Sequence, residues 1–238
     1  MNPTGHDSDL KFDRNCHAIY SKQLKKKIRQ CIAEHYPKEE REKVFEAFQM
    51  QFVDYLKDYR TDLGGKRNFH NGVCGTYDCI AMFSYYKVCK DATSFEEIER
   101  IAAELITDSF KGLGTYVNLN RKVYKYLMYN AFRKAKKRCD RWKDYDMRLN
   151  PYDNKKPLTY KFYSCPTSEF AREHGFLDVL PALCNSDYAA MEVLHAKLIR
   201  TTTLGRGECC DYAICGDKDP YVKEHPEYRD ENGGRWNK

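Results

Sequence analysis

Apolar residues at helical spacing dominate the first 150 residues of the chain. Leu24, Ile28 and Ile32 recur every four residues, and Pro37 separates them from a second stripe. That stripe contains six residues: Val44, Phe45, Phe48, Phe52, Leu56 and Tyr59. Side chains at this spacing line one face of an α-helix. The pattern therefore predicts two amphipathic helices before residue 60.

A third stripe begins behind a capping signal. Ser94 and Glu97 form a capping box, in which the serine oxygen accepts from the third helical amide and the glutamate reaches back to the cap. The apolar residues behind it are Ile98, Ile101, Ala102, Leu105 and Phe110. We expect this helix to end near Gly112, and the apolar run 80–88 to form another, buried helix.

A strongly basic segment follows at residues 121–143, with ten Lys or Arg and one acid, Asp140. Val123, Leu127 and Ala131 recur every four residues, which predicts the inner stripe of a solvated helix. Such a charge run can also track nucleic acid or an acidic membrane. Because the tyrosines here match no nucleic-acid motif, we expect no nucleic-acid partner and no membrane contact.

The pattern changes after a polar, proline-flanked connector at residues 150–157. Residues 158–164 alternate as a strand does. Cys165-Pro166 then opens a short helix that Gly175 caps, because glycine tolerates the left-handed conformation of a helix end. Asn185-Ser186 is expected to cap a helix that runs to about residue 195.

A hairpin is predicted next, with strands at residues 196–204 and 208–215 joined by a turn at residues 205–207. Helices followed by a small sheet indicate an α+β protein. We expect an N-terminal helical region (residues 1–150) packed with a small antiparallel sheet carrying inserted helices (residues 151–220). A polar, proline-punctuated tail (residues 221–238) should pack loosely, and the whole should form one compact unit.

The cysteine content and the apolar content of the chain indicate its cellular location. The 238 residues include eleven cysteines, an odd number scattered along the chain. Secreted disulfide scaffolds are usually short, with an even cysteine count. The start, MNPTGHDSDLKFDRN, lacks the apolar core of a signal peptide, and no apolar run is long enough to span a bilayer. We therefore expect a cytoplasmic protein with mostly reduced thiols.

Two regions carry candidate chemistry. In the first, Cys74 and Cys79 with His70 and Asp78 could ligate zinc, but a lone pair spaced C-x4-C favours a packing role. The second spans the last eighty residues. Its candidates are Cys165, Cys184, Asp187, His195, Cys209, Cys210 and Asp211.

Alternation along residues 208–215 places Cys210 on the same face as Tyr212 and Ile214, and Asp211 on the other. Asp187 and His195 can equally be charges that complement helix ends. Cys184 at a helix start suits a nucleophile, whereas a cysteine is more often a small core residue. Spacing does not support a zinc site among these scattered residues, so no cofactor is expected.

The segment 165–217 resembles the signature of the L-2-amino-thiazoline-4-carboxylic acid hydrolase family. The resemblance lies in Cys165-Pro before the E-F-A-x-E-H-G helix, in L-C-x-x-D at residues 183–187, in L-I-R-T at 198–201 and in GECCDY at 207–212. Upstream, G-G-K-x-N at residues 64–68 is also similar. The likeness extends from about residue 20 to 220 and is strongest in the last third.

The resemblance implies a small bacterial, cytoplasmic hydrolase of cysteine metabolism. It would open the thiazoline ring of 2-amino-thiazoline-4-carboxylate to give N-carbamoyl-cysteine, which requires an acid, a base and a carboxylate anchor. We assign the acid and base to Asp187 and His195, and place Cys184 and Cys210 in the catalytic site, one of them as nucleophile or metal ligand. Substrate binding is assigned to Arg200, Asn68 and Asp211.

A second interpretation is a non-enzymatic sensor that binds a small ligand. The helix, strand and hairpin also resemble, more weakly, 4-vinyl-reductase-like domains, in which nearby cysteines can hold structural zinc. A hydrolase needs polar groups converging on a cavity, whereas a sensor tolerates an apolar pocket. Both interpretations predict a small-molecule ligand, and both allow a homo-oligomer.

Overall fold

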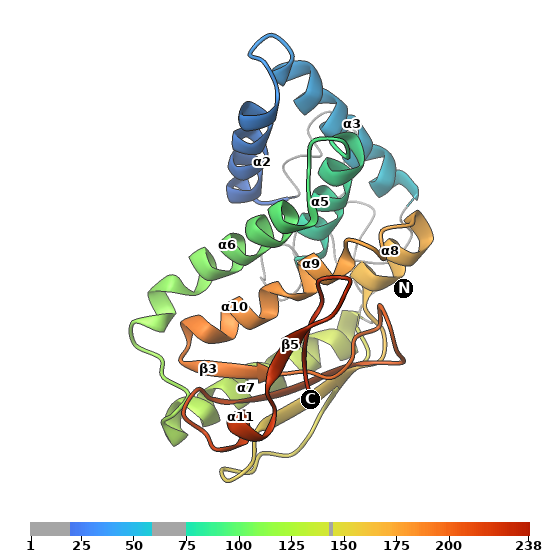
Figure 1. Cartoon of the computed structure of the whole chain (residues 1–238). Helices are drawn as coiled ribbons and strands as arrows, with labels where there is room; N and C mark the ends of the chain where they lie inside the picture. Colours follow the sequence, from blue (N-terminus) through green and yellow to red (C-terminus); the bar gives the residue numbers. More distant parts are fainter. Residues whose placement is uncertain (1–19, 59–74, 143–144) are drawn as a thin grey trace. The chain divides into compact units, whose positions relative to one another are not determined.

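The computed structural model describes residues 20–58, 75–142 and 145–238 (Figure 1). The chain divides into two compact units, the first ending at Ile101 and the second beginning at Ala102. Helices lie mostly in the N-terminal part, and a small antiparallel sheet lies in the C-terminal part. This confirms the predicted α+β class. No helix in the described segments has the length and apolar character needed to cross a bilayer.

The first unit is helical, and its helices follow the predicted stripes. They are α2 (Lys22–His35), α3 (Arg41–Asp58), α5 (Thr76–Val88) and the start of α6 (Phe95–Gly114). The two predicted stripes are buried along Leu24, Ile28, Cys31 and Ile32 in α2 and along Phe45, Phe48 and Phe52 in α3. Periodicity was sufficient here because each helix has one apolar face only.

The apolar run 80–88 forms a helix, as predicted, and its residues 80–85 are buried in α5. At its start, the Asp78 carboxylate accepts a hydrogen bond from the Ser21 backbone N–H at 2.7 Å. Asp78 therefore has a structural partner in the protein itself. Of the other members of the upstream zinc hypothesis, Cys79 lies in α5, and Cys74 and His70 lie outside the described residues.

The capping box of α6 forms only in part. The Glu97 backbone N–H donates to the Ser94 hydroxyl at 3.2 Å, as expected. The Glu97 carboxylate, however, accepts from the Tyr85 hydroxyl at 2.7 Å and pairs with His35. The helix runs to Gly114, where a Cβ would come within 2.4 Å of the Val193 carbonyl oxygen. Only glycine fits at that contact.

The second unit is built on a four-stranded antiparallel sheet in the order β1-β2-β4-β3. The strands are β1 (Met147–Leu149), β2 (Leu158–Phe162), β3 (Ala196–Ile199) and β4 (Cys210–Gly216). Leu158, Leu198 and Ile214 form the sheet side of its apolar core. Tyr188 supplies the facing side from α10 (Ser186–Val193).

The basic segment forms α7 (Lys122–Trp142), but the predicted inner stripe is wrong. Val123 and Leu127 are 58% and 55% exposed, and Ala131 is also exposed. The sheet is instead met by Met128 and Phe132, which pack against the apolar core. Two stripes compete on this helix, and the one with the larger side chains is partly buried against the apolar core.

The predicted hairpin exists, with shorter strands and a longer loop. β3 ends at Ile199 and β4 begins at Cys210. In the loop between these strands, the backbone N–H groups of Thr201 and Thr202 donate to the carboxylate of Asp211, a β4 residue, at 2.9 and 2.8 Å. Because a side chain takes these two amides, the threonine run leaves the strand ladder.

Two short helices precede α10: α8 (Pro166–His174) and α9 (Leu180–Cys184). α8 starts with Pro166 and ends at Gly175 in the left-handed conformation, at φ 74°, as predicted. The predicted cap of α10 is wrong, because the Asn185 side chain makes no capping hydrogen bond. Its amide instead donates to the Gly233 carbonyl and its oxygen accepts from the Arg235 N–H.

The prediction of a loosely packed tail is therefore wrong as well. The tail forms α11 (Tyr221–Glu224) and a hairpin of β5 (Glu227–Arg229) and β6 (Arg235–Asn237). Trp236 and Asn237 are buried. A polar segment can pack in this way when each polar group finds a partner, and those partners lie about 40 residues upstream. No local pattern in the tail reveals them.

Candidate functional site

One face of the β2–β4 strand pair carries apolar side chains at one end and tyrosine and cysteine side chains toward the other. The pairs Leu158–Ile214, Tyr160–Tyr212 and Phe162–Cys210 follow each other in register across β2 and β4. The first pair belongs to the apolar core, and the two tyrosine rings stack at 4.6 Å. The alternation predicted for β4 thus brings Cys210 and Tyr212 to the same end of this face.

Asp187 lies at this end, in the first turn of α10. Its Oδ2 accepts from the Tyr212 hydroxyl at 3.1 Å and from Arg200 Nη1 at 3.4 Å. Burial raises the pKa of the Asp187 carboxyl, and the Arg200 guanidinium and Tyr212 hydroxyl only partly oppose it. The side chain nevertheless remains 38% accessible.

Neighbouring groups also combine a pKa raised by burial with some remaining accessible surface. Burial raises the pKa of Tyr160, Tyr212, Cys165 and Cys184, although each residue keeps some accessible surface. We call this set, together with Asp187, the Asp187 recess, meaning a group of side chains that are surrounded by protein and still keep accessible surface.

Arg200 supplies a permanent charge behind the recess. It directly follows β3, is 0% exposed, and donates from Nη1 to the Cys184 carbonyl at 3.0 Å. Its Nε and Nη2 have no hydrogen-bond partner in the described structure. Burial alone lowers the pKa of this guanidinium, but Tyr212, Cys184 and Asp187 raise it by more. Arg200 therefore stays charged at every working pH.

Three thiols interact electrostatically around this charge: Cys165, Cys184 and Cys210. Cys210 accepts from the Leu204 N–H at 3.3 Å, and burial raises the pKa of its thiol to about 12. Burial also raises the pKa of Cys165, opposed by the nearby N–H groups of Ser168 and Thr167. All three are therefore neutral thiols near pH 7.

One of three comparisons with known proteins gives a match. A family model described as L-2-amino-thiazoline-4-carboxylic acid hydrolase matches residues 77–214. The chain belongs to this family. No curated protein and no solved structure matches the chain significantly. The match confirms the resemblance drawn from residues 165–217, and it includes every residue of the Asp187 recess and Arg200.

The structure brings together five of the residues singled out in this hydrolase-family sequence: Cys165, Cys184, Asp187, Arg200 and Cys210. Tyr160 and Tyr212 complete the recess and were not assigned a role from sequence. Tyr212 could have been found, because alternation places it on the face of Cys210. Tyr160 required the register between β2 and β4.

Other candidates lie elsewhere. His195 follows the far end of α10, eight residues or roughly 12 Å of helix rise from Asp187. It is 52% exposed, with Nδ1 3.9 Å from Asp217. Asp211 holds the threonine loop, as described above, and Cys209 lies outside the recess. Asn68 falls outside the described residues. Among the described residues, no group of three or more His, Cys, Asp or Glu is arranged to hold a metal.

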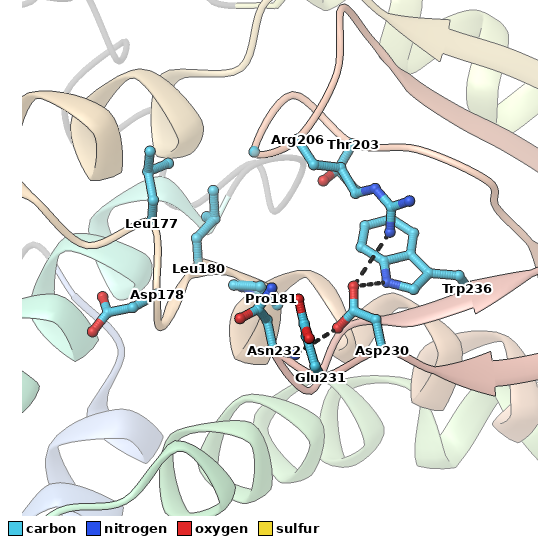
Figure 2. A pocket seen from close by; sticks show the side chains of 11 residues that line it. Leu177, Asp178, Leu180, Pro181, Thr203, Arg206, Asp230, Glu231, Asn232 and Trp236 are labelled. Atoms are coloured by element: carbon cyan, nitrogen blue, oxygen red, sulfur yellow. Dashed lines mark hydrogen bonds and ion pairs between the residues drawn. The ribbon is translucent and has the colours of Figure 1, made fainter.

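A separate cavity of about 590 Å³ lies beside the C-terminal hairpin (Figure 2). It shares no lining residue with the Asp187 recess. Its walls come from the segment around α9, from the β3–β4 loop and from residues 230–236, and the last of these lie beyond the family match. Gly205 is pressed against this wall, since a Cβ there would come within 3.0 Å of Leu180.

Proposed function

We propose that the chain hydrolyses a small cyclic amidine carboxylate, with 2-amino-thiazoline-4-carboxylate as the substrate. The observation that supports this most is the Asp187 carboxyl, which sits in a recess with a raised pKa and a tyrosine donor. Membership of the hydrolase family supplies the reaction class. Unbridged thiols at Cys165, Cys184 and Cys210 support a cytoplasmic location, since such thiols persist in reducing compartments.

The reaction adds water to the carbon between the ring sulfur and ring nitrogen. The C–O bond forms, the C–S bond breaks, and the product is N-carbamoyl-cysteine with a free thiol. Water adds across the carbon–nitrogen double bond of the ring, so one of its protons goes to the ring nitrogen, and the other goes to the departing sulfur as the carbonyl group forms. One carboxyl group can serve both transfers, by passing the first proton from the attacking water to the ring nitrogen and the second from the hydroxyl group to sulfur.

Asp187 is the residue proposed for that double role. A general acid–base works best when its pKa is close to the working pH, and burial moves this carboxyl in that direction. Tyr212 donates to Oδ2 and so fixes the orientation of the carboxyl group. The other carboxylate oxygen carries the proton transfer in this proposal.

Arg200 is proposed as a positioning residue in this scheme. Its side chain has no accessible surface, so it acts through its contacts with Asp187 and the Cys184 carbonyl. A fixed positive charge there keeps the carboxyl ionisable despite its burial. This differs from the carboxylate anchor expected from sequence, because an anchor must touch the substrate.

Thiol titration tests the proposal directly. The purified protein is incubated with 2-amino-thiazoline-4-carboxylate, and released thiol is followed against a boiled control. We expect thiol and N-carbamoyl-cysteine to appear in equal amounts, the latter identified by mass spectrometry. If no thiol is released above the control, the thiazoline is not the substrate. A panel of related cyclic amidine carboxylates then tests the broader class.

A further inference from the structure

The cavity of Figure 2 has the size and walls of a small-molecule site. Its volume of about 590 Å³ lies within the usual range for such sites. Apolar surface comes from Leu177, Leu180, Pro181 and Trp236, and the charged lining groups are Asp178, Asp230, Glu231 and Arg206. Three carboxylates against one guanidinium make the lining negative, which favours a cation.

One carboxylate and one aromatic ring form a fixed receptor in this cavity. The Trp236 indole N–H donates to Asp230 Oδ2 at 2.6 Å. Asp230 Oδ1 accepts from the backbone N–H groups of Asn232 and Gly234, at 3.0 and 2.9 Å. The carboxylate is thus held beside the indole by three donors. Flat cations bind where a ring face and a carboxylate are presented together.

Arg206 already occupies this receptor. Its guanidinium carbon lies 4.3 Å from the centroid of the Trp236 ring, and its Nη1 lies 3.3 Å from Asp230 Oδ2. The Arg206 side chain is 46% exposed. An exposed ion pair of this kind contributes only about 0–1 kcal/mol, so a ligand can displace it.

We propose that this cavity binds a small organic cation, a guanidinium or ammonium group on an apolar body, and that Arg206 is the internal occupant that the ligand replaces. The cation takes the place of the Arg206 guanidinium on Trp236 and Asp230. The apolar body fills the space toward Leu180 and Pro181. The cavity shares no lining residue with the Asp187 recess, and four of its residues, Asp230, Glu231, Asn232 and Trp236, lie beyond the family match.

Calorimetric titration with butylguanidinium tests this proposal, with uncharged butyramide as the matched probe. The decisive variant is Arg206→Ala, and Lys223→Ala is its control, because Lys223 is exposed and does not line the cavity. We expect Arg206→Ala to bind butylguanidinium about fivefold more tightly than the unaltered chain, since the internal competitor is gone. Lys223→Ala should leave the affinity unchanged.

Three results would overturn the proposal. They are equal affinity in Arg206→Ala and Lys223→Ala, equal binding of butyramide, and no detectable binding in Arg206→Ala. Adding Asp230→Asn to Arg206→Ala should abolish the gained affinity. If that double variant does not fold, as judged by circular dichroism, the comparison of Arg206→Ala with Lys223→Ala still decides.

Discussion

Two arginines lie against the same tryptophan, but they differ in solvent exposure. The guanidinium carbon of Arg200 lies 5.4 Å from the Trp236 ring, and that of Arg206 lies 4.3 Å from it. Each also pairs with one aspartate at nearly the same distance, 3.4 Å to Asp187 and 3.3 Å to Asp230. Arg200 is fully buried, whereas nearly half of the Arg206 side chain is exposed.

The comparison shows that burial, more than distance, decides what an ion pair does. The Arg200 charge has been removed from water, and its Nε and Nη2 find no hydrogen-bond partner among the described residues, so it is maintained by the fold around it. The Arg206 charge can exchange its partners with solvent. The first is suited to set the protonation of a neighbouring group, and the second to give way to a ligand.

The largest expected effect is the difference between the two arginines in their contribution to the free energy of unfolding. Arg200→Ala should lower the free energy of unfolding by about 3–5 kcal/mol, because it leaves a cavity and removes the charge that compensates Asp187. Arg206→Ala should stay within about 0.5 kcal/mol, as for most surface substitutions. Urea denaturation followed by circular dichroism measures both. Equal losses would show that Arg200 is not the more deeply integrated charge.

The two ion pairs should also differ in their effect on activity: the Asp187 pair should matter and the Asp230 pair should not. Asp187→Asn should reduce thiol release from the thiazoline at least ~100-fold, because proton transfer is lost while the shape is kept. Arg206→Ala, which disturbs the other pair, should leave that rate unchanged. A normal rate in folded Asp187→Asn would remove this residue from the mechanism.

Removing the second donor to Asp187 sharpens this result. Tyr212→Phe deletes the 3.1 Å hydrogen bond and retains the ring that stacks on Tyr160. A bond to a carboxylate contributes about 1.5 kcal/mol or more, so thiol release should fall about tenfold. The pH–rate profile should also shift, which a purely structural role of the tyrosine would not produce.

The titration of Asp187 should be visible in stability. Its pKa in the folded chain lies above the ordinary value of 3.8, so the folded state binds this proton more tightly than the unfolded state. Stability due to the neutral carboxyl is therefore present at low pH and lost as pH rises through the folded pKa. Compared with Asp187→Asn, the unaltered chain should lose stability as pH rises from about 4. The opposite slope would mean that Arg200 outweighs burial.

The smallest effect is expected at His195. The residue adopts a φ of 53°, which asparagine also tolerates, so His195→Asn should fold normally. Because it lies at the far end of α10, thiol release should change by less than about twofold. A loss near ~100-fold would return His195 to the acid–base role expected from sequence.

Sequence was sufficient wherever one local pattern determined the outcome. The stripes of α2 and α3 each have one apolar face, and the alternation of β4 correctly separated Cys210 from Asp211. The family motif contains Cys184, Asp187 and Arg200, which contact one another in the structure. In each case the relevant residues are close in sequence or belong to one repeated spacing.

Sequence failed where two solutions competed or where the partner was distant. Val123 and Leu127 formed an acceptable stripe on α7, but Met128 and Phe132 fill the space beside the sheet better. Asn185 was expected to cap its own helix, yet it binds the hairpin almost 50 residues later. Polar partners of that kind leave no periodic trace.

The sequence separation between Asn237 and Arg200 affects the order in which these contacts form. The backbone N–H and side-chain oxygen of Asn237 bind the carbonyl and the N–H of Arg200, at 2.8 and 3.0 Å. A growing chain that has left the ribosome only as far as Ile214 already holds every recess residue, but lacks this clamp and the Trp236 ring. Domains fold as units during synthesis. The clamp on the buried arginine can therefore close only after Asn237 has left the ribosome, later than every residue of the recess.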